Sequence, residues 1–146
     1  MIPKSIVRIL AGENILIFGD GSQTRDFTYV EDTAQGLIAA AEQDSLIGQT
    51  LNIGSNFEIS IKELAERLIE ICDTPKAGIT YTPDRPGDVG RLFADPSRFM
   101  ELTGWQPRTD FSSGLQKTIS YFRNHPAGVE RLHAAEAGRN WNLRTP

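Results

Sequence analysis

The sequence contains few of the residues from which metal clusters and disulfides are built. Its 146 residues include a single cysteine, Cys72, and two histidines, His125 and His133. One cysteine excludes an internal disulfide and a cysteine cluster, and the histidines have no ligand-like spacing to other donors. We therefore expect no metal site. Cys72 lies beside the apolar stripe of a helix without a neighbouring histidine, and we interpret it as a core residue rather than a nucleophile.

Excess positive charge and long apolar runs are also missing. The net charge is -4 and the pI is about 5.2, so the chain lacks the basic face that broad binding to nucleic acid or to anionic membranes needs. No apolar run is long enough to span a bilayer, and the N-terminus does not resemble a secretory leader. We expect no nucleic-acid or membrane partner, and a cytoplasmic location is the default for such a chain.

Two motifs of nicotinamide-dependent enzymes are absent as well. Gly19 and Gly21 follow an apolar run, but Thr24 occupies the place of the third glycine in a dinucleotide-binding Gly-x-Gly-x-x-Gly loop. None of the three tyrosines is followed by a lysine four residues later, and no Walker-type phosphate loop is present. The chain therefore carries neither a cofactor loop nor a Tyr-x-x-x-Lys pair of its own.

Short apolar runs alternate with helical patterns, which predicts an α/β fold with four or five helices and four short strands. Strands are expected at residues 15–18, 26–30, 50–53 and 79–82. Helices are expected to begin near residues 5, 32, 60, 96 and 110, the last opened by Asp110 or Ser112. Ser60 and Glu63 form a capping box at the clearest helix. Trp105 is expected to anchor a turn in the core.

The carboxylate pair Glu31–Asp32 has two interpretations. Asp32 has a glutamine three residues later and is predicted to cap the next helix, and acid–base chemistry is the alternative. Behind it, Ala34, Leu37, Ile38 and Ala41 share one helical face, as the printed sequence shows. Their small size predicts close packing of this helix against a sheet.

Two arginines are candidates for binding an anionic ligand. Arg25 follows the Gly19–Gly21 turn, and Arg85 opens the loop Arg-Pro-Gly-Asp that ends at Asp88. A guanidinium fork matches phosphate oxygens, and two such charges suit a diphosphate, while Asp88 could accept hydrogen bonds from sugar hydroxyls. The plain alternatives are a surface pair of Arg25 with Asp20 or Asp26, and an Arg–Asp pair inside the loop.

Several stretches, taken together and in order, resemble a known family. They are IFGDGSQTRDFTYVEDTAQGLIAAAE, LNIGSNFEISIKELAE, RPGD, FADPSRFMELTGWQP and GLQKTISYF. Over residues 2–124 the chain is similar to the C-terminal, substrate-binding part of extended short-chain dehydrogenase/reductases, the NAD-dependent nucleotide-sugar epimerases and dehydratases. The resemblance implies a small α/β region that normally packs on an N-terminal Rossmann domain. That domain would hold NAD, the catalytic tyrosine and the homodimer contact.

The resemblance also assigns residues. Arg25 and Arg85 match diphosphate-binding arginines, Asp88 matches an acid near the ribose, and Ile17 and Phe18 match a short strand along the nucleotide base. Residues 1–125 would form the nucleotide-sugar-binding region and residues 126–146 a tail outside the resemblance. The helix lined by alanines would expose an apolar face when this piece is alone.

The leading hypothesis is that the chain is the UDP- or dTDP-sugar-binding part of a 4,6-dehydratase or 4-epimerase. The stretches RDFTYVEDTAQG and NIGSNFEISI are more similar to the dehydratase branch. The chain by itself would be inactive, because the cofactor loop and the tyrosine are missing. The alternative is a stand-alone nucleotide-sugar-binding module without catalysis.

Overall fold

The computed structural model describes residues 1–74 and 76–137. Within them the chain forms six α-helices, a single 3₁₀ turn and five short strands, which confirms the α/β class. The helices are α1 (Ile2–Leu10), α2 (Val30–Ala41), α3 (Ile61–Cys72), α4 (Ser97–Thr103), α5 (Phe111–Arg123) and α6 (Val129–Ala137). The strands are β1 (Ile15–Phe18), β2 (Thr24–Asp26), β3 (Glu58–Ser60), β4 (Ile79–Thr82) and β5 (Arg91–Leu92).

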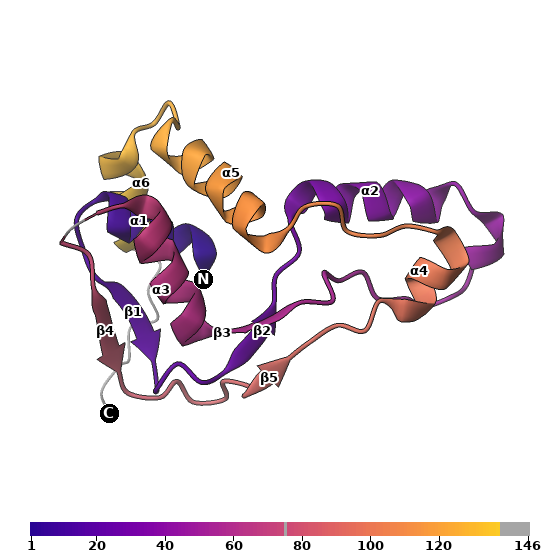
Figure 1. Ribbon diagram of the computed structural model, residues 1–146, viewed down its shortest axis with the longest axis horizontal. Coiled ribbons are helices and arrows are strands. Elements are labelled where there is room, and N and C mark those ends of the chain that lie inside the picture. The colour runs from indigo at the N-terminus through magenta and orange to yellow at the C-terminus, as the bar shows by residue number, and fades with distance from the viewer. Residues whose placement is uncertain (75, 138–146) are drawn as a thin grey trace.

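The strands form two small sheets. β1 and β4 pair in parallel, with Ile15 opposite Ile79 and Phe18 opposite Thr82. In the second sheet β2 is central, antiparallel to β3 and parallel to β5. The chain enters β2 directly from the turn after β1, so both sheets meet at residues 19–23 (Figure 1).

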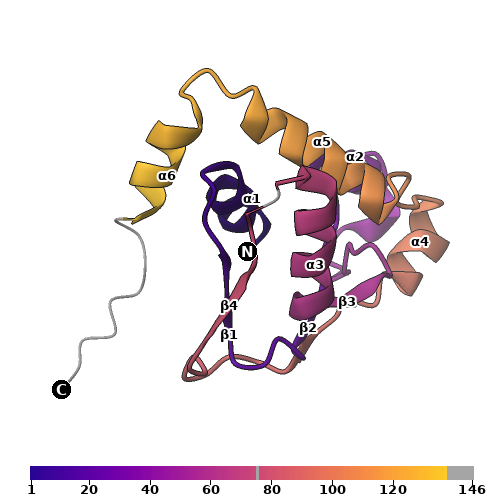
Figure 2. The same cartoon turned by 60° about the vertical axis from the view of Figure 1, so that its left-hand side comes forward.

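The molecule is elongated because it has two separate cores. In Figure 1, α2 and α4 extend to one side, away from α1, α3, α5 and α6. Figure 2 shows α1 and α3 beside the β1–β4 pair, with α5 packed on α1 and α3. The larger core lies among these elements and includes Ile6, Ile9, Ile15, Ile17, Ile59, Ile61, Leu64, Ala65, Leu68, Cys72, Leu115 and Ile119. The smaller core consists of Leu46, Phe99 and Trp105, so the predicted anchoring by Trp105 is confirmed.

Several helix boundaries follow from local capping chemistry. The Ser60 hydroxyl accepts a hydrogen bond from the Glu63 N–H at 3.1 Å, and the Asp110 carboxylate accepts one from Ser113 N–H at 3.0 Å. Both caps satisfy amide groups that a helix cannot pair internally, and both predicted starts are confirmed. At α4, the Asp95 carboxylate accepts from Ser97 N–H, and the helix begins at Ser97, one residue later than Pro96.

The prediction that Asp32 caps the second helix is wrong. α2 begins at Val30, with Tyr29 as its N-cap and no side-chain cap. Asp32 lies in the first turn, where its buried carboxylate accepts hydrogen bonds from the backbone N–H groups of Arg108 and Thr109 at 3.0 and 3.1 Å. These groups lie before α5, so Asp32 is a tether between distant segments. Sequence spacing contains no sign of a partner 76 residues away.

Two predicted strands also differ from the structure. The second strand covers Thr24–Asp26 rather than residues 26–30, because the chain turns at Tyr29 into α2. Residues 50–53 form no strand. Ile53 packs instead beside Gly36 of α2 and belongs to the periphery of the smaller core. The short strands β3 and β5 were not expected, since each has only two or three residues and depends on pairing with β2.

The first part of the expected tail is helical. α6 lies against α1, and His133 Nε2 is 3.2 Å from the carboxylate of Glu13, which lies between α1 and β1. Residues 138–146 of that tail lie outside the described residues. No described helix is long and apolar enough to cross a membrane.

Candidate functional site

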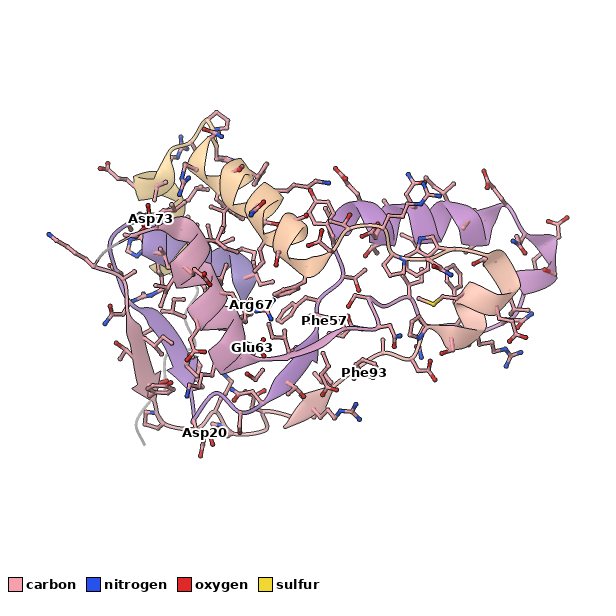
Figure 3. All side chains as sticks on the ribbon, viewed as in Figure 1. Asp20, Phe57, Glu63, Arg67, Asp73 and Phe93 are labelled. Carbon is pink, nitrogen blue, oxygen red and sulfur yellow. The ribbon has the colours of Figure 1, made fainter. Side chains whose placement is uncertain are left out.

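The carboxyl ends of β1 and β4 lie at the same edge, because the strands are parallel. The loops that leave them are residues 19–23 and 83–90. Ligands of open α/β sheets bind outside the carboxyl ends of parallel strands. An open hollow of about 660 Å³ lies at this edge and is lined by Gly19, Asp20, Tyr81, Thr82, Pro83 and Asp84. Figure 3 shows Asp20 in the turn at this end of the molecule.

The loop after β4 packs closely on the turn after β1. Gly19 has φ +71°, a backbone conformation that favours glycine, and the Asp84 carboxylate lies where a side chain at this position would begin. Arg85 then places its guanidinium over the ring of Phe18, 4.2 Å from the centroid. This cation–π contact joins two of the residues that the sequence assigned to one site.

Arg25 and Asp88 form the second contact of the site. Arg25 Nη2 lies 2.7 Å from Asp88 Oδ1, and Nη1 donates to the backbone carbonyl of Thr24 at 2.7 Å. Both ion pairs that the sequence offered as alternatives to a ligand site are therefore wrong. Arg25 pairs with neither Asp20 nor Asp26, and Asp88 does not pair with the arginine of its own loop. The ion pair joins β2 to the loop after β4 across 63 residues.

The structure gives the five assigned residues different surroundings. Ile17 is fully buried in the larger core, and its carbonyl accepts a hydrogen bond from the Thr82 hydroxyl. A ligand cannot reach this side chain, so the role proposed for Ile17 is limited to shaping β1. Phe18 and Arg25 are half-buried, whereas Arg85 and Asp88 are exposed. Two pairs thus carry the site, Phe18 with Arg85 and Arg25 with Asp88.

A cluster of hydrogen bonds among Thr24, Glu58 and Arg91, named here the clasp, was not predicted from the sequence. It lies on the other face of β2 from Arg25. Arg91 of β5 donates two hydrogen bonds to the Glu58 carboxylate of β3, at 2.7 and 2.8 Å, and the Thr24 hydroxyl donates a third. These hydrogen bonds, those from Arg91 foremost, lower the pKa of Glu58 to about 2. The clasp joins β3 to β5 across β2. It thereby holds β5, the strand that follows the 83–90 loop. No local pattern connects Glu58 with Arg91, since β3 and β5 are recognisable only in the folded sheet.

Asp26 fixes another segment beside the site. Its Oδ1 accepts hydrogen bonds from the N–H and hydroxyl of Ser55, while Oδ2 is buried and has no hydrogen-bond partner among the described residues. A Cβ on Gly54 would lie 2.7 Å from Oδ2 and 2.8 Å from Ala94. Because Gly54 has no side chain, its segment can pack closely against both Asp26 and Ala94. This packing holds β2, and with it Arg25, in position.

The remaining candidates fall outside this site. Cys72 is buried in the larger core, as predicted, and burial raises the pKa of its thiol. Among the described residues, no group of three acidic, histidine or cysteine side chains is arranged to hold a metal. The described part of the chain also contains no strand–loop–helix unit of the kind that binds NAD. The turn after β1 leads into β2, not into a helix whose N-terminus would meet a pyrophosphate.

Comparison with protein families matches residues 1–118 to the GDP-mannose 4,6 dehydratase family. The chain belongs to this family. It is one of the families of extended short-chain dehydrogenase/reductase type that contain nucleotide-sugar epimerases and dehydratases, as the resemblance predicted. A curated relative, dTDP-glucose 4,6-dehydratase from an Actinoplanes strain, is 35% identical over 123 residues. That match covers 84% of this chain and 38% of the relative.

Solved structures agree with this membership. An epimerase from Methanothermobacter thermautotrophicus superposes with a TM-score of 0.84 at 32% identity, over 89% of this chain and 39% of that one. A UDP-glucuronic acid 4-epimerase from Bacillus cereus, solved with UDP-glucuronic acid and NAD, has a TM-score of 0.77 at 33% identity. There the match covers 82% of this chain and 38% of that one. The chain thus spans less than half the length of these relatives.

Proposed function

We propose that this chain forms the nucleotide-sugar-binding part of an NAD-dependent epimerase or dehydratase. The observation that carries the proposal is that the loop after β4 places Arg85 on Phe18 and Asp88 on Arg25. Each arginine faces the site in the company of a second assigned residue, Asp88 or Phe18. Two guanidinium groups suit the diphosphate of a UDP- or dTDP-sugar, and the Phe18 ring offers an apolar surface for a nucleotide base.

The chemical step is assigned to a part of the parent that is not in this sequence. NAD held by that part would supply the hydride-transfer chemistry. This chain would grip the diphosphate and orient the sugar, which lowers the entropic part of the barrier. The relatives named above include both dehydratases and epimerases, which supports the proposed class of activity.

An exposed helix face supports the need for a second part. Val30, Leu37 and Ile38 of α2 are 70%, 61% and 49% exposed, and Ala34 and Ala41 on the same side are exposed too. Within the described residues the helix therefore does not pack its alanine-lined face on a sheet, contrary to the expectation from its small residues. We propose that this face, named here the α2 face, receives the NAD-binding part. Covering it would remove apolar surface from water.

Calorimetric titration tests the proposal. UDP-glucose and dTDP-glucose are titrated into this chain alone and into a longer form in which an NAD-binding part precedes it. Binding by the longer form alone is the expected result. Tight binding by the chain alone would favour the stand-alone module, and absence of binding in both forms would contradict a nucleotide-sugar site.

Substitution of the two arginines tests the site itself. In the form that binds, Arg25→Ala and Arg85→Ala should each weaken nucleotide-sugar binding by about 2 kcal/mol or more, because each removes a charge-assisted phosphate contact. Arg67→Ala is the matched control, since Arg67 also pairs with a carboxylate at 2.7 Å but lies on α3. Unchanged affinity in both site variants would remove the diphosphate assignment.

A further inference from the structure

The two contact pairs of the site join the same two stretches of chain. Arg85 and Asp88 lie in the loop after β4, where the Asp88 N–H donates to the Arg85 carbonyl at 3.1 Å. Arg85 lies over Phe18 at one end of residues 18–25, and Asp88 pairs with Arg25 at the other end. Both pairs form at once only if the separation of Phe18 and Arg25 matches the span of the loop.

One side chain bridges the stretch from Phe18 to Arg25. Gln23 Nε2 donates a hydrogen bond to the Phe18 carbonyl at 2.9 Å. Gln23 is half-buried and lies two residues before Arg25. Its amide thus ties the last residue of β1 to the residue that precedes β2.

The two ends of this bridge belong to different sheets. At the β1 end, the Gly19 N–H donates to the Thr82 carbonyl of β4 at 2.9 Å. At the β2 end, the Gln23 carbonyl accepts from the Ile61 N–H in the first turn of α3, also at 2.9 Å. Each end is therefore held in its own sheet by main-chain hydrogen bonds, and the Gln23 amide connects the two sheets.

We propose that Gln23 is a positioning residue of the nucleotide-sugar site, on which this inference rests. Its amide sets the separation of Phe18 and Arg25 at which Arg85 and Asp88 both reach their partners. A ligand that carries a base and a diphosphate engages both ends of this stretch, and two contacts act together only when their separation fits the ligand. Gln23 acts through the main chain and needs no contact with the ligand.

Packing of the larger core is the competing explanation for the arrangement of the two sheets. Ile17 of β1 and Ile59 of β3 both belong to this core, so apolar contacts also connect the sheets. If these contacts alone determined the arrangement, the side chain at position 23 would be dispensable for binding. The two explanations therefore predict different affinities for variants of Gln23.

The test removes the N–H donor and keeps the length of the side chain. UDP-glucose is titrated by calorimetry into Gln23→Met, made in the form of the protein that binds nucleotide sugars. Affinity should fall about fivefold, as expected for one lost hydrogen bond. Gln23→Asn, whose shorter side chain no longer reaches the Phe18 carbonyl, should lose affinity as well. Full affinity in either variant would contradict the role of Gln23.

Gln49→Met is the matched control. Gln49 Nε2 also donates to a main-chain carbonyl, that of Ser45 at 2.8 Å, and neither residue belongs to the two stretches of the site. This variant should bind UDP-glucose as the unchanged protein does. An equal loss of affinity in Gln49→Met and Gln23→Met would indicate a general effect of lost stability and would contradict the proposal.

A double-substitution cycle with Arg85 distinguishes positioning from a general loss of stability. In the unchanged protein Arg85→Ala should weaken UDP-glucose binding about thirtyfold. In the Gln23→Met background the same substitution should cost several-fold less, because the ligand no longer engages both ends of the stretch fully. Equal costs in the two backgrounds would show that Gln23 acts independently of Arg85, against the proposal.

The outcomes separate this proposal from the proposed function. If UDP-glucose binding depends on Arg25 and Arg85 but is unchanged in Gln23→Met, the role of Gln23 is wrong and the nucleotide-sugar site stands. If UDP-glucose binds to no form of the protein, the site and the role of Gln23 both fail.

Discussion

Glu58 shows how a single carboxylate couples the sheet to pH. Its pKa is lowered to about 2 from the ordinary 4.5, first through the hydrogen bonds from Arg91 and then through that from Thr24. Between these two values the folded state binds fewer protons at Glu58 than the unfolded state does. The stabilisation is therefore present above about pH 4.5 and is lost as the pH falls toward 2.

The substitution Glu58→Gln should reduce this dependence on pH. Thermal unfolding from pH 7 to 2.5 is expected to show a smaller loss of melting temperature in the variant than in the unchanged chain. Arg91 is 66% exposed, so added salt should weaken the difference. An identical pH profile in the two proteins would show that the clasp does not contribute to stability.

At the scale of elements, α2 is joined to the rest of the chain by a buried carboxylate. Asp32 is 5% exposed and accepts the N–H groups of Arg108 and Thr109. The tether links the first turn of α2 to the segment that enters α5. A helix that presents an apolar face to solvent needs such a connection to keep its orientation.

Removal of this carboxylate should be costly. Asp32→Ala leaves two amide groups without acceptors, and we expect the free energy of unfolding to fall by about 2 kcal/mol. Glu31→Ala is the control, because Glu31 is exposed and only reaches Lys117 at 3.6 Å. Urea denaturation measures both variants. Equal effects would mean that the two backbone hydrogen bonds do not hold α2.

On the scale of the whole molecule, the described residues form two cores and leave the α2 face uncovered. The larger core holds β1 and β3 in place, while the smaller core supports α2 and α4. The α2 face belongs to neither. The matched region makes up only 38% and 39% of the two relatives. The exposure of the α2 face is consistent with a partner part in the remainder of such proteins.

The α2 face should respond to charge without loss of the fold. Because Leu37 is 61% exposed, Leu37→Glu should change the unfolding free energy by less than about 0.5 kcal/mol. It should lower the binding of an apolar dye and any self-association seen by light scattering. Tyr121→Glu, at an equally exposed position on α5, should change dye binding less. Strong destabilisation by Leu37→Glu would show that the face is already packed.

Local chemistry determined much of this protein from the sequence by itself. Apolar runs specified β1 and β4, the side chains of Ser60 and Asp110 specified two helix starts, and the ordered stretches specified the family. These signals act within a few residues, or they survive as a pattern along the chain. The role assigned to Arg25 and Arg85 also came from the sequence and stays a prediction.

Tertiary structure decided the partners. Arg25 meets Asp88 rather than Asp20 or Asp26, and Asp32 meets backbone groups before α5 rather than its own helix. β3 and β5 exist only because β2 lies between them. Each of these contacts joins residues more than thirty positions apart, so its energy depends on a fold that no short window of sequence contains. That physical reason separates what the sequence determined from what only the folded chain could show.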